Sequence, residues 1–125
     1  MQKQTVAIVG LGRVGSVFLE KLLAQTNKGI VIVAVAEKGA TAGAALAKSS
    51  GIENLSLDQL VAKSNNIDIL FDLTGLTEVR QELREKLMAS GNRNTVIATE
   101  SIAALIWALI SDGEDLPNVH TKVGY

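Results

Sequence analysis

The chain has 125 residues, enough for one compact domain, and 47% of them are hydrophobic while 20% are charged. Its 12 Lys and Arg residues and 13 Asp and Glu residues leave a formal net charge of −1, which excludes a generally basic nucleic-acid-binding protein. One Trp, one Tyr and two Phe are too few for aromatic platforms that stack bases. The absence of Cys excludes disulfides and cysteine zinc sites, and a single His excludes a multi-histidine metal site within one chain.

Membrane and export signals are not apparent in the sequence. The longest strictly apolar stretch, Ile102–Ile110, is about half as long as a membrane-spanning helix. The apolar run near the N-terminus is interrupted by Gly10, Gly12 and Arg13, and no small-residue cleavage site follows it. We therefore expect a cytoplasmic protein whose partners include neither nucleic acid nor a membrane.

The first part of the chain alternates between strand-like and helix-like hydrophobic patterns. Ile30–Ala36 is a continuous apolar run, which is typical of a parallel strand covered on both faces. The preceding Asn27-Lys28-Gly29 supplies the chemistry of a turn. In chain order we expect a strand over Thr5–Val9, a helix over Val14–Leu23, a strand over Ile30–Ala36, a helix over Thr41–Lys48 and a short edge strand over Ile52–Leu55.

The second part continues the same alternation. Its clearest helix has Val79, Leu83 and Leu87 at helical spacing, and Gly91 follows where a helix commonly ends. In chain order we expect a short helix over Leu57–Ser64 with Ser56 as its cap, a strand over Ile67–Leu73, a helix over Thr77–Ser90, a strand over Asn94–Thr99 and a helix over Ser101–Ser111. Beyond Pro117 the sequence shows no clear pattern.

This alternation predicts an α/β fold built on a single doubly wound parallel sheet of about five strands. The right-handed crossover rule favours the strand order 3-2-1-4-5. No repeat, linker or low-complexity segment interrupts the pattern, so we expect one domain over residues 1–125.

A glycine motif joins the first expected strand to the first expected helix. Gly10-Leu11-Gly12-Arg13-Val14-Gly15 matches G-x-G-x-x-G, and Glu37 lies 22 residues after Gly15 at the end of the second strand. Gly10 would permit the tight turn, Gly12 the approach of a pyrophosphate to the backbone, and Gly15 close packing of the helix. This context predicts a Rossmann dinucleotide site. The alternative is a glycine turn in a fold that binds nothing.

Residues around this motif suggest which cofactor would bind. Glu37 would accept hydrogen bonds from the adenosine ribose, which favours NAD, while the adjacent Lys38 leaves NADP possible. The backbone of Val14 belongs to the helix N-terminus that would face the diphosphate. Arg13 lies in the turn and either touches a phosphate or is a solvated surface residue.

A second constellation follows the fourth expected strand, at Asp72-Leu73-Thr74-Gly75. Ligands of open parallel sheets bind at the carboxyl ends of the strands, beside the point where the strand order reverses. Thr74 and Gly75 are therefore expected near the nicotinamide end of the cofactor. The alternative is a simple strand-to-helix turn with Thr74 as its cap.

Three segments together resemble the cofactor-binding half of homoserine dehydrogenases. They are Val6–Val9 with the glycine turn, Asp68–Gly75 and Thr95–Glu100, and the glucose–fructose oxidoreductase family is similar at the same places. The resemblance covers nearly the whole chain at the level of one domain. It implies a Rossmann fold and an NAD(P) cofactor.

Two departures from these families bear on catalysis. The resemblance implies a second, substrate-binding domain, whereas this sequence ends at Tyr125. It also implies a functional lysine just after the fifth strand, where this chain has Ser101. The hydroxyl of Ser101 cannot replace a cationic or basic amine. No neighbouring residue in the sequence indicates that Glu100 acts as a general base. We therefore assign no catalytic residue and no metal ligand, and we expect that the isolated chain is not an enzyme.

The chain also resembles short Rossmann modules of bacterial signalling proteins, which have no substrate domain. Its Gly-Leu-Gly-Arg-Val-Gly turn is similar to that of nucleotide-binding domains that regulate potassium channels and transporters. Those domains carry a Gly-Asp motif after the third strand, and this sequence contains no Gly-Asp dipeptide.

Within the last expected helix, the stretch Ile102–Ile110 is apolar on all sides and shows no polar stripe. One face can pack on the sheet, and the other is expected to bind a second copy of the chain or a partner protein, with Trp107 as an anchor. Burial under the C-terminal tail is the alternative. His120 in that tail is expected to be a surface residue.

The favoured function is a stand-alone NAD(P)-binding module that senses a nucleotide or a redox state without complete catalytic machinery. The first alternative is the cofactor-binding half of an oxidoreductase whose substrate domain lies on another chain or is missing. A nucleotide-gated regulatory domain of a transporter is a further alternative, and a Rossmann scaffold that binds nothing is the last.

Overall fold

The computed structural model describes residues 3–110. The last expected residue of the final helix, Ser111, and the tail residue His120 lie outside this range. Two 3-10 turns, Thr26–Lys28 and Ser64–Asn66, accompany the main elements. The main elements are β1 (Gln4–Val9), α1 (Arg13–Leu23), β2 (Ile30–Ala36), α2 (Ala42–Ser49), β3 (Glu53–Asn54), α3 (Leu57–Ala62), β4 (Ile69–Asp72), α4 (Thr77–Ala89), β5 (Val96–Ala98) and α5 (Glu100–Ile110).

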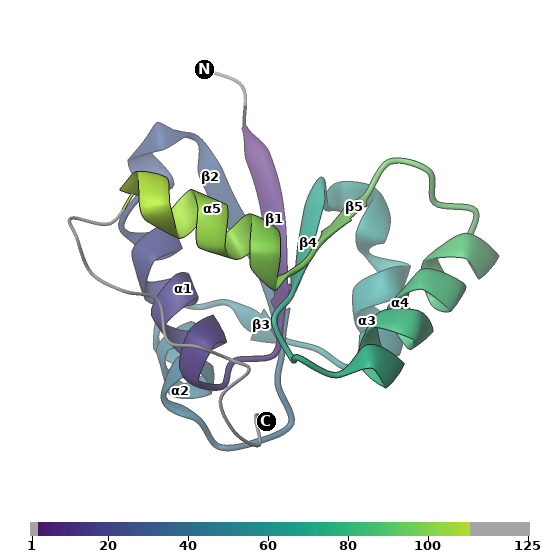
Figure 1. Ribbon diagram of the computed structural model, residues 1–125, viewed down its shortest axis with the longest axis horizontal. Coiled ribbons are helices and arrows are strands. Elements are labelled where there is room, and N and C mark those ends of the chain that lie inside the picture. Colours follow the sequence, from purple (N-terminus) through teal and green to yellow (C-terminus); the bar gives the residue numbers. More distant parts are fainter. Residues whose placement is uncertain (1–2, 111–125) are drawn as a thin grey trace.

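The five strands form one parallel sheet in the order β3-β2-β1-β4-β5. Helices α1, α2 and α5 cover one face of this sheet, and α3 and α4 cover the other (Figure 1). The prediction of a doubly wound α/β fold with strand order 3-2-1-4-5 is therefore confirmed. The order reverses at the central strand β1, so the carboxyl ends of β1 and β4 flank the position where such sheets bind ligands.

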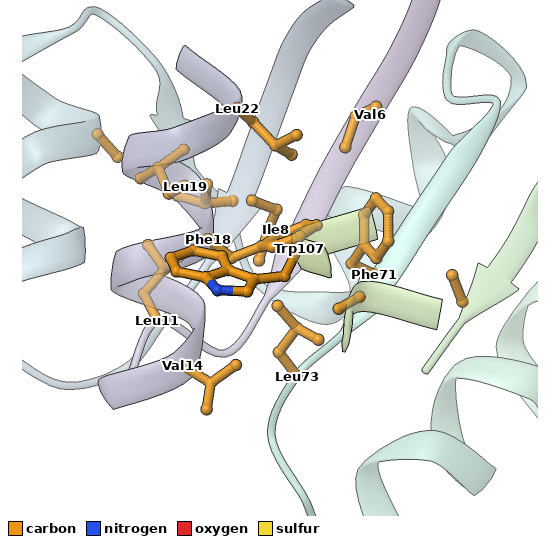
Figure 2. Close-up of a cluster of buried hydrophobic side chains, with 14 residues drawn as sticks. Val6, Ile8, Leu11, Val14, Phe18, Leu19, Leu22, Phe71, Leu73 and Trp107 are labelled. Atoms are coloured by element: carbon orange, nitrogen blue, oxygen red, sulfur yellow. The ribbon is translucent and has the colours of Figure 1, made fainter. Parts of the chain in front are cut away.

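The side chains of β1 alternate between two hydrophobic clusters, one on each face of the sheet. Val6 and Ile8 face the cluster under α1, α2 and α5, and Ala7 and Val9 face the cluster under α3 and α4. In the first cluster (Figure 2) the rings of Phe18 and Phe71 meet edge to face, with their centroids 4.9 Å apart. This packing joins α1 to β4.

Local capping signals place most of the helix ends. The Thr41 hydroxyl accepts a hydrogen bond from Ala44 N at 3.0 Å at the start of α2, and Ser56 and Gln59 form a reciprocal capping box at the start of α3. Gly91, with φ of 78°, follows α4 as expected. The strands β3, β4 and β5 are shorter than predicted. At the start of β4, Ile67 N still donates to Ser64 O in the preceding turn.

Helix α5 packs on the sheet with one face only. Ala103 is buried in the first cluster, as is Trp107 (Figure 2), whereas Ile102, Leu105 and Leu109 are 45%, 60% and 77% exposed. The expectation that Trp107 anchors an intermolecular contact is therefore wrong, because its ring lies inside its own domain. An all-apolar helix gives no sequence signal for which face turns inward. None of the helices between residues 3 and 110 is long and apolar enough to cross a membrane.

Candidate functional site

The glycine turn between β1 and α1 is built from positions that have no room for a side chain. Gly10 has a φ of 92°, and a Cβ there would lie 2.9 Å from both the backbone N and the Cγ2 of Thr74. A Cβ on Gly15 would overlap the carbonyl oxygen of Gly10. Gly10 and Gly15 are therefore required by the packing of the turn, which holds α1 close to the end of β1 and the β4–α4 loop close to both.

The N-terminus of α1 opens at this turn. Gly12 is its N-cap residue, and among the described residues no side chain caps it and its first turn contains no acid. Arg13 is exposed, and the side chain of Val14 is buried in the core, so Val14 can reach a ligand through its backbone alone. An uncapped helix start presents backbone N–H groups and a partial positive charge, which suits a phosphate.

The structure brings Glu37 to the same turn. Its Oε1 accepts a hydrogen bond from Leu11 N at 2.6 Å, and its Oε2 accepts one from Gly39 N at 2.8 Å. Two neutral donors hold the carboxylate beside the glycine motif, and within the described part of the chain no cation pairs with its charge. The adjacent Lys38 is exposed to solvent.

Asn54 fixes the backbone of Glu37 from the neighbouring strand β3. Its Oδ1 accepts from Glu37 N at 2.9 Å, and its Nδ2 donates to Glu37 O at 3.0 Å. Sequence reasoning missed this residue. The available signal was its place at the end of the expected edge strand, because parallel strands that pair bring their carboxyl ends together.

The β4–α4 loop lies on the other side of the glycine turn. Thr74 donates from Oγ1 to Asp72 Oδ1 at 2.7 Å, and the same hydroxyl accepts from Leu76 N at 3.1 Å. Leu76 is the N-cap residue of α4, so Thr74 is not the helix cap that one interpretation of the sequence suggested. Gly75 is exposed with a φ of 73°, which reverses the chain without a side chain at this edge.

Two charged side chains that the sequence analysis left without a role lie next to this loop. Arg80 donates to Asp72 and to both carboxylate oxygens of Glu100. Glu100 is thus committed to an ion pair and is not a free proton acceptor. Ser101, at the position of the expected family lysine, is exposed. Within residues 3–110 no group of three or more potential ligands is placed to hold a metal ion.

Comparison with known proteins agrees with this geometry. Residues 10–106 match the family described as homoserine dehydrogenase, NAD binding domain. The chain belongs to this family. The resemblance inferred from the sequence is confirmed, and the expected cofactor is the one in the family's description. No curated protein sequence matches the chain.

Solved structures share the fold. A homoserine dehydrogenase from S. aureus has a TM-score of 0.59 and 18% identity, and the match covers 90% of this chain and 30% of that one. A homoserine dehydrogenase from Thiobacillus denitrificans has a TM-score of 0.57 and 26% identity, covering 87% and 26% of the two chains. RSP in complex with β-NADH has a TM-score of 0.57 and 13% identity, covering 86% and 60%. The chain therefore spans about a third of the dehydrogenases' length.

Replacing Gly15 with alanine tests the close packing of the turn. Helix propensity alone would favour Gly15→Ala, because alanine stabilises helices relative to glycine. The overlap with the Gly10 carbonyl oxygen instead predicts a loss of about 1–3 kcal/mol in the free energy of unfolding, measured by urea denaturation. A variant as stable as the wild type would show that the turn accommodates a Cβ at position 15.

Gly91→Ala is the matched control. Gly91 has a positive φ of 78°, which Gly15 does not, and open space surrounds its missing Cβ. We expect only the cost of the left-handed conformation, about 1 kcal/mol. This variant should leave ligand binding at the glycine turn unchanged.

Proposed function

We propose that this domain binds NAD across the carboxyl edge of its sheet and acts as a nucleotide-sensing or redox-sensing module. The observation that carries the proposal is the juxtaposition of an uncapped helix N-terminus with an acid that no cation among residues 3–110 neutralises. The backbone of Gly12, Val14 and Gly15 opens α1, and Glu37 is held beside it through Leu11 N.

The residues of the turn fit the two halves of an adenosine diphosphate group. The backbone amides at the start of α1 would bind the diphosphate. Arg13 is the first residue of this helix and is exposed, so its guanidinium would contact a phosphate as well. Each oxygen of Glu37 accepts one hydrogen bond from the backbone and has a further lone pair for a ribose hydroxyl. Because a 2′-phosphate would meet this carboxylate, NAD is preferred over NADP.

The other half of the dinucleotide would extend toward β4, on the opposite side of the glycine turn. Thr74 and Gly75 lie there, and the contact of Thr74 with the Gly10 backbone makes the two loops one continuous edge. Bound NAD would supply a nicotinamide that accepts or returns hydride. The residues of this edge hold and orient that group.

A binding role is favoured over catalysis by the side chains at the end of β5. Ser101 occupies the position at which the family resemblance implies a lysine, and Glu100 is paired with Arg80 on both oxygens. A general base needs an available basic group, but Ser101 offers only a hydroxyl and the Glu100 carboxylate is held by Arg80. The output of the module would then be a change in stability or assembly on cofactor binding.

The second candidate is the cofactor-binding half of an oxidoreductase related to homoserine dehydrogenase. Family membership and the coverage of about a third of the dehydrogenase chains favour it. Reduction of NAD⁺ by the purified chain in the presence of homoserine would support this candidate and contradict a purely sensing role.

Glu37→Gln tests the cofactor preference. The amide keeps the size of the side chain but loses the charge and one of the two acceptors that face Leu11 N and Gly39 N. We expect the affinity for NAD⁺ to fall about tenfold or more and the preference for NAD⁺ over NADP⁺ to shrink. Isothermal titration calorimetry with both cofactors measures these changes.

Glu85→Gln is the matched control for that experiment. Glu85 is exposed on α4, where Gln81 contacts it, and no part of the proposed site touches it. Its substitution should leave both affinities unchanged. Equal affinities of the wild type and Glu37→Gln would remove the role assigned to this acid.

We also propose that the exposed face of α5 binds a second copy of the chain. The face consists of apolar side chains, with Ile102, Leu105 and Leu109 exposed. It contains no charge that would select an oppositely charged partner. Two copies related by a two-fold axis can therefore meet on this face without like-charge repulsion.

Leu105→Glu tests this assembly. A charge at the centre of the paired faces would be buried in the dimer, so we expect the variant to be monomeric where the wild type has twice the 13.2 kDa chain mass. Light scattering coupled to size-exclusion chromatography measures the mass. Met88→Glu is the control, because Met88 is a 79% exposed apolar residue on α4, on the other face of the sheet. A monomeric wild type at high concentration would contradict the proposal.

A further inference from the structure

A cluster of three charged side chains lies at the carboxyl end of β4, next to the β4–α4 loop. Asp72 is the last residue of β4, Arg80 lies in the first turn of α4, and Glu100 is the first residue of α5. Arg80 Nε donates to Asp72 Oδ2 at 3.2 Å, and Arg80 Nη2 donates to Glu100 Oε1 and Oε2 at 2.9 and 2.7 Å. One guanidinium therefore links three separate elements.

The burial of the cluster makes this link more than a surface ion pair. The side chain of Asp72 is fully buried, that of Glu100 is 15% exposed and that of Arg80 is 22% exposed. A buried carboxylate needs a charged partner, and Arg80 is the cation that contacts Asp72 among the described residues. The planar guanidinium can serve two acids at once because its donors point in different directions.

Asp72 carries this constraint from Arg80 to the proposed cofactor edge. Its second oxygen, Oδ1, accepts from Thr74 N at 3.1 Å and from Thr74 Oγ1 at 2.7 Å. Thr74 packs so closely on Gly10 that no Cβ fits there. A continuous series of contacts therefore connects α5 to the glycine turn through Arg80, Asp72 and Thr74.

We propose that Arg80 is a positioning residue for the nicotinamide half of the bound cofactor. It fixes Thr74 and Gly75 against the glycine turn and holds the first turn of α5 beside them. The adenosine half is positioned on the β2 side, by Glu37 and Asn54, through hydrogen bonds that do not involve Arg80 or Asp72. This inference rests on the proposed function, because it assigns a role within the same site.

Arg80→Lys separates the two halves of the site. The single ammonium of lysine cannot reproduce the geometry in which Nε meets Asp72 while Nη2 holds both oxygens of Glu100. The charge opposite Asp72 is retained, so the fold should persist. We expect the affinity for NAD⁺ to fall about tenfold, while the affinity for ADP-ribose, which lacks the nicotinamide, stays within about twofold.

Glu100→Gln provides a second variant that leaves Asp72 and its guanidinium partner in place. It weakens only the connection between α4 and α5, so we expect the same selective loss of NAD⁺ affinity at smaller amplitude. Lys86→Gln is the control on the same helix, because Lys86 pairs with Asp58 of α3 rather than with the cofactor edge. Its affinities for NAD⁺ and ADP-ribose should equal those of the wild type.

Calorimetric titrations of these variants with NAD⁺ and ADP-ribose decide the matter. A loss confined to NAD⁺ supports the positioning role. Equal losses for both ligands would overturn it and show a general structural effect, and unchanged NAD⁺ binding in Arg80→Lys would overturn it as well. A wild-type chain that binds neither ligand would instead overturn the proposed function.

Discussion

The architecture of the site depends on the lack of space at Gly10 and Gly15. The carbonyl oxygen of Gly10 occupies the volume of a Cβ on Gly15, and Thr74 occupies that of a Cβ on Gly10. Because of these two contacts, α1 begins directly over the end of β1, and the β4–α4 loop lies against the turn. The helix N-terminus and the two flanking loops thus become one edge on which a dinucleotide fits.

Electrostatics divides this edge into two dissimilar sides. On the β2 side, Glu37 is held by backbone N–H groups, which fix its position and leave its charge unpaired by any described cation. On the β4 and β5 side, Asp72 and Glu100 are both bound by Arg80. The first arrangement suits recognition of ribose hydroxyls, and the second suits a rigid support. This contrast between the two sides underlies the binding role proposed for the site.

Much of the fold could be predicted because each signal was local. The strand order follows from the alternation of apolar runs and from crossover handedness, and Ser56 and Gly91 mark helix ends through their own backbone preferences. The contact of Glu37 with the glycine turn could also be anticipated, since both end neighbouring parallel strands.

The remaining features depend on tertiary geometry that no local pattern encodes. Arg80 meets Asp72 and Glu100 only because of the rotation of α4 about its axis, and the spacing of apolar residues fixes that rotation to within a broad stripe. The inward face of α5 was not predictable, because a helix that is apolar on all sides offers several faces of equal hydrophobicity. Trp107 was consequently assigned to the wrong side of that helix.

The central claim is that a dinucleotide binds where the glycine turn, Glu37 and the β4–α4 loop meet. The most direct measurement is a titration of the ¹⁵N-labelled chain with NAD⁺, monitored through the backbone amide resonances in two-dimensional NMR spectra. The account predicts saturable changes in chemical shift concentrated at residues 10–15, 37–39 and 73–76. Changes should be small at the C-terminal ends of α3 and α4, which lie away from this edge of the sheet. Unchanged spectra at high NAD⁺ concentration, or shifts confined to other parts of the chain, would contradict it.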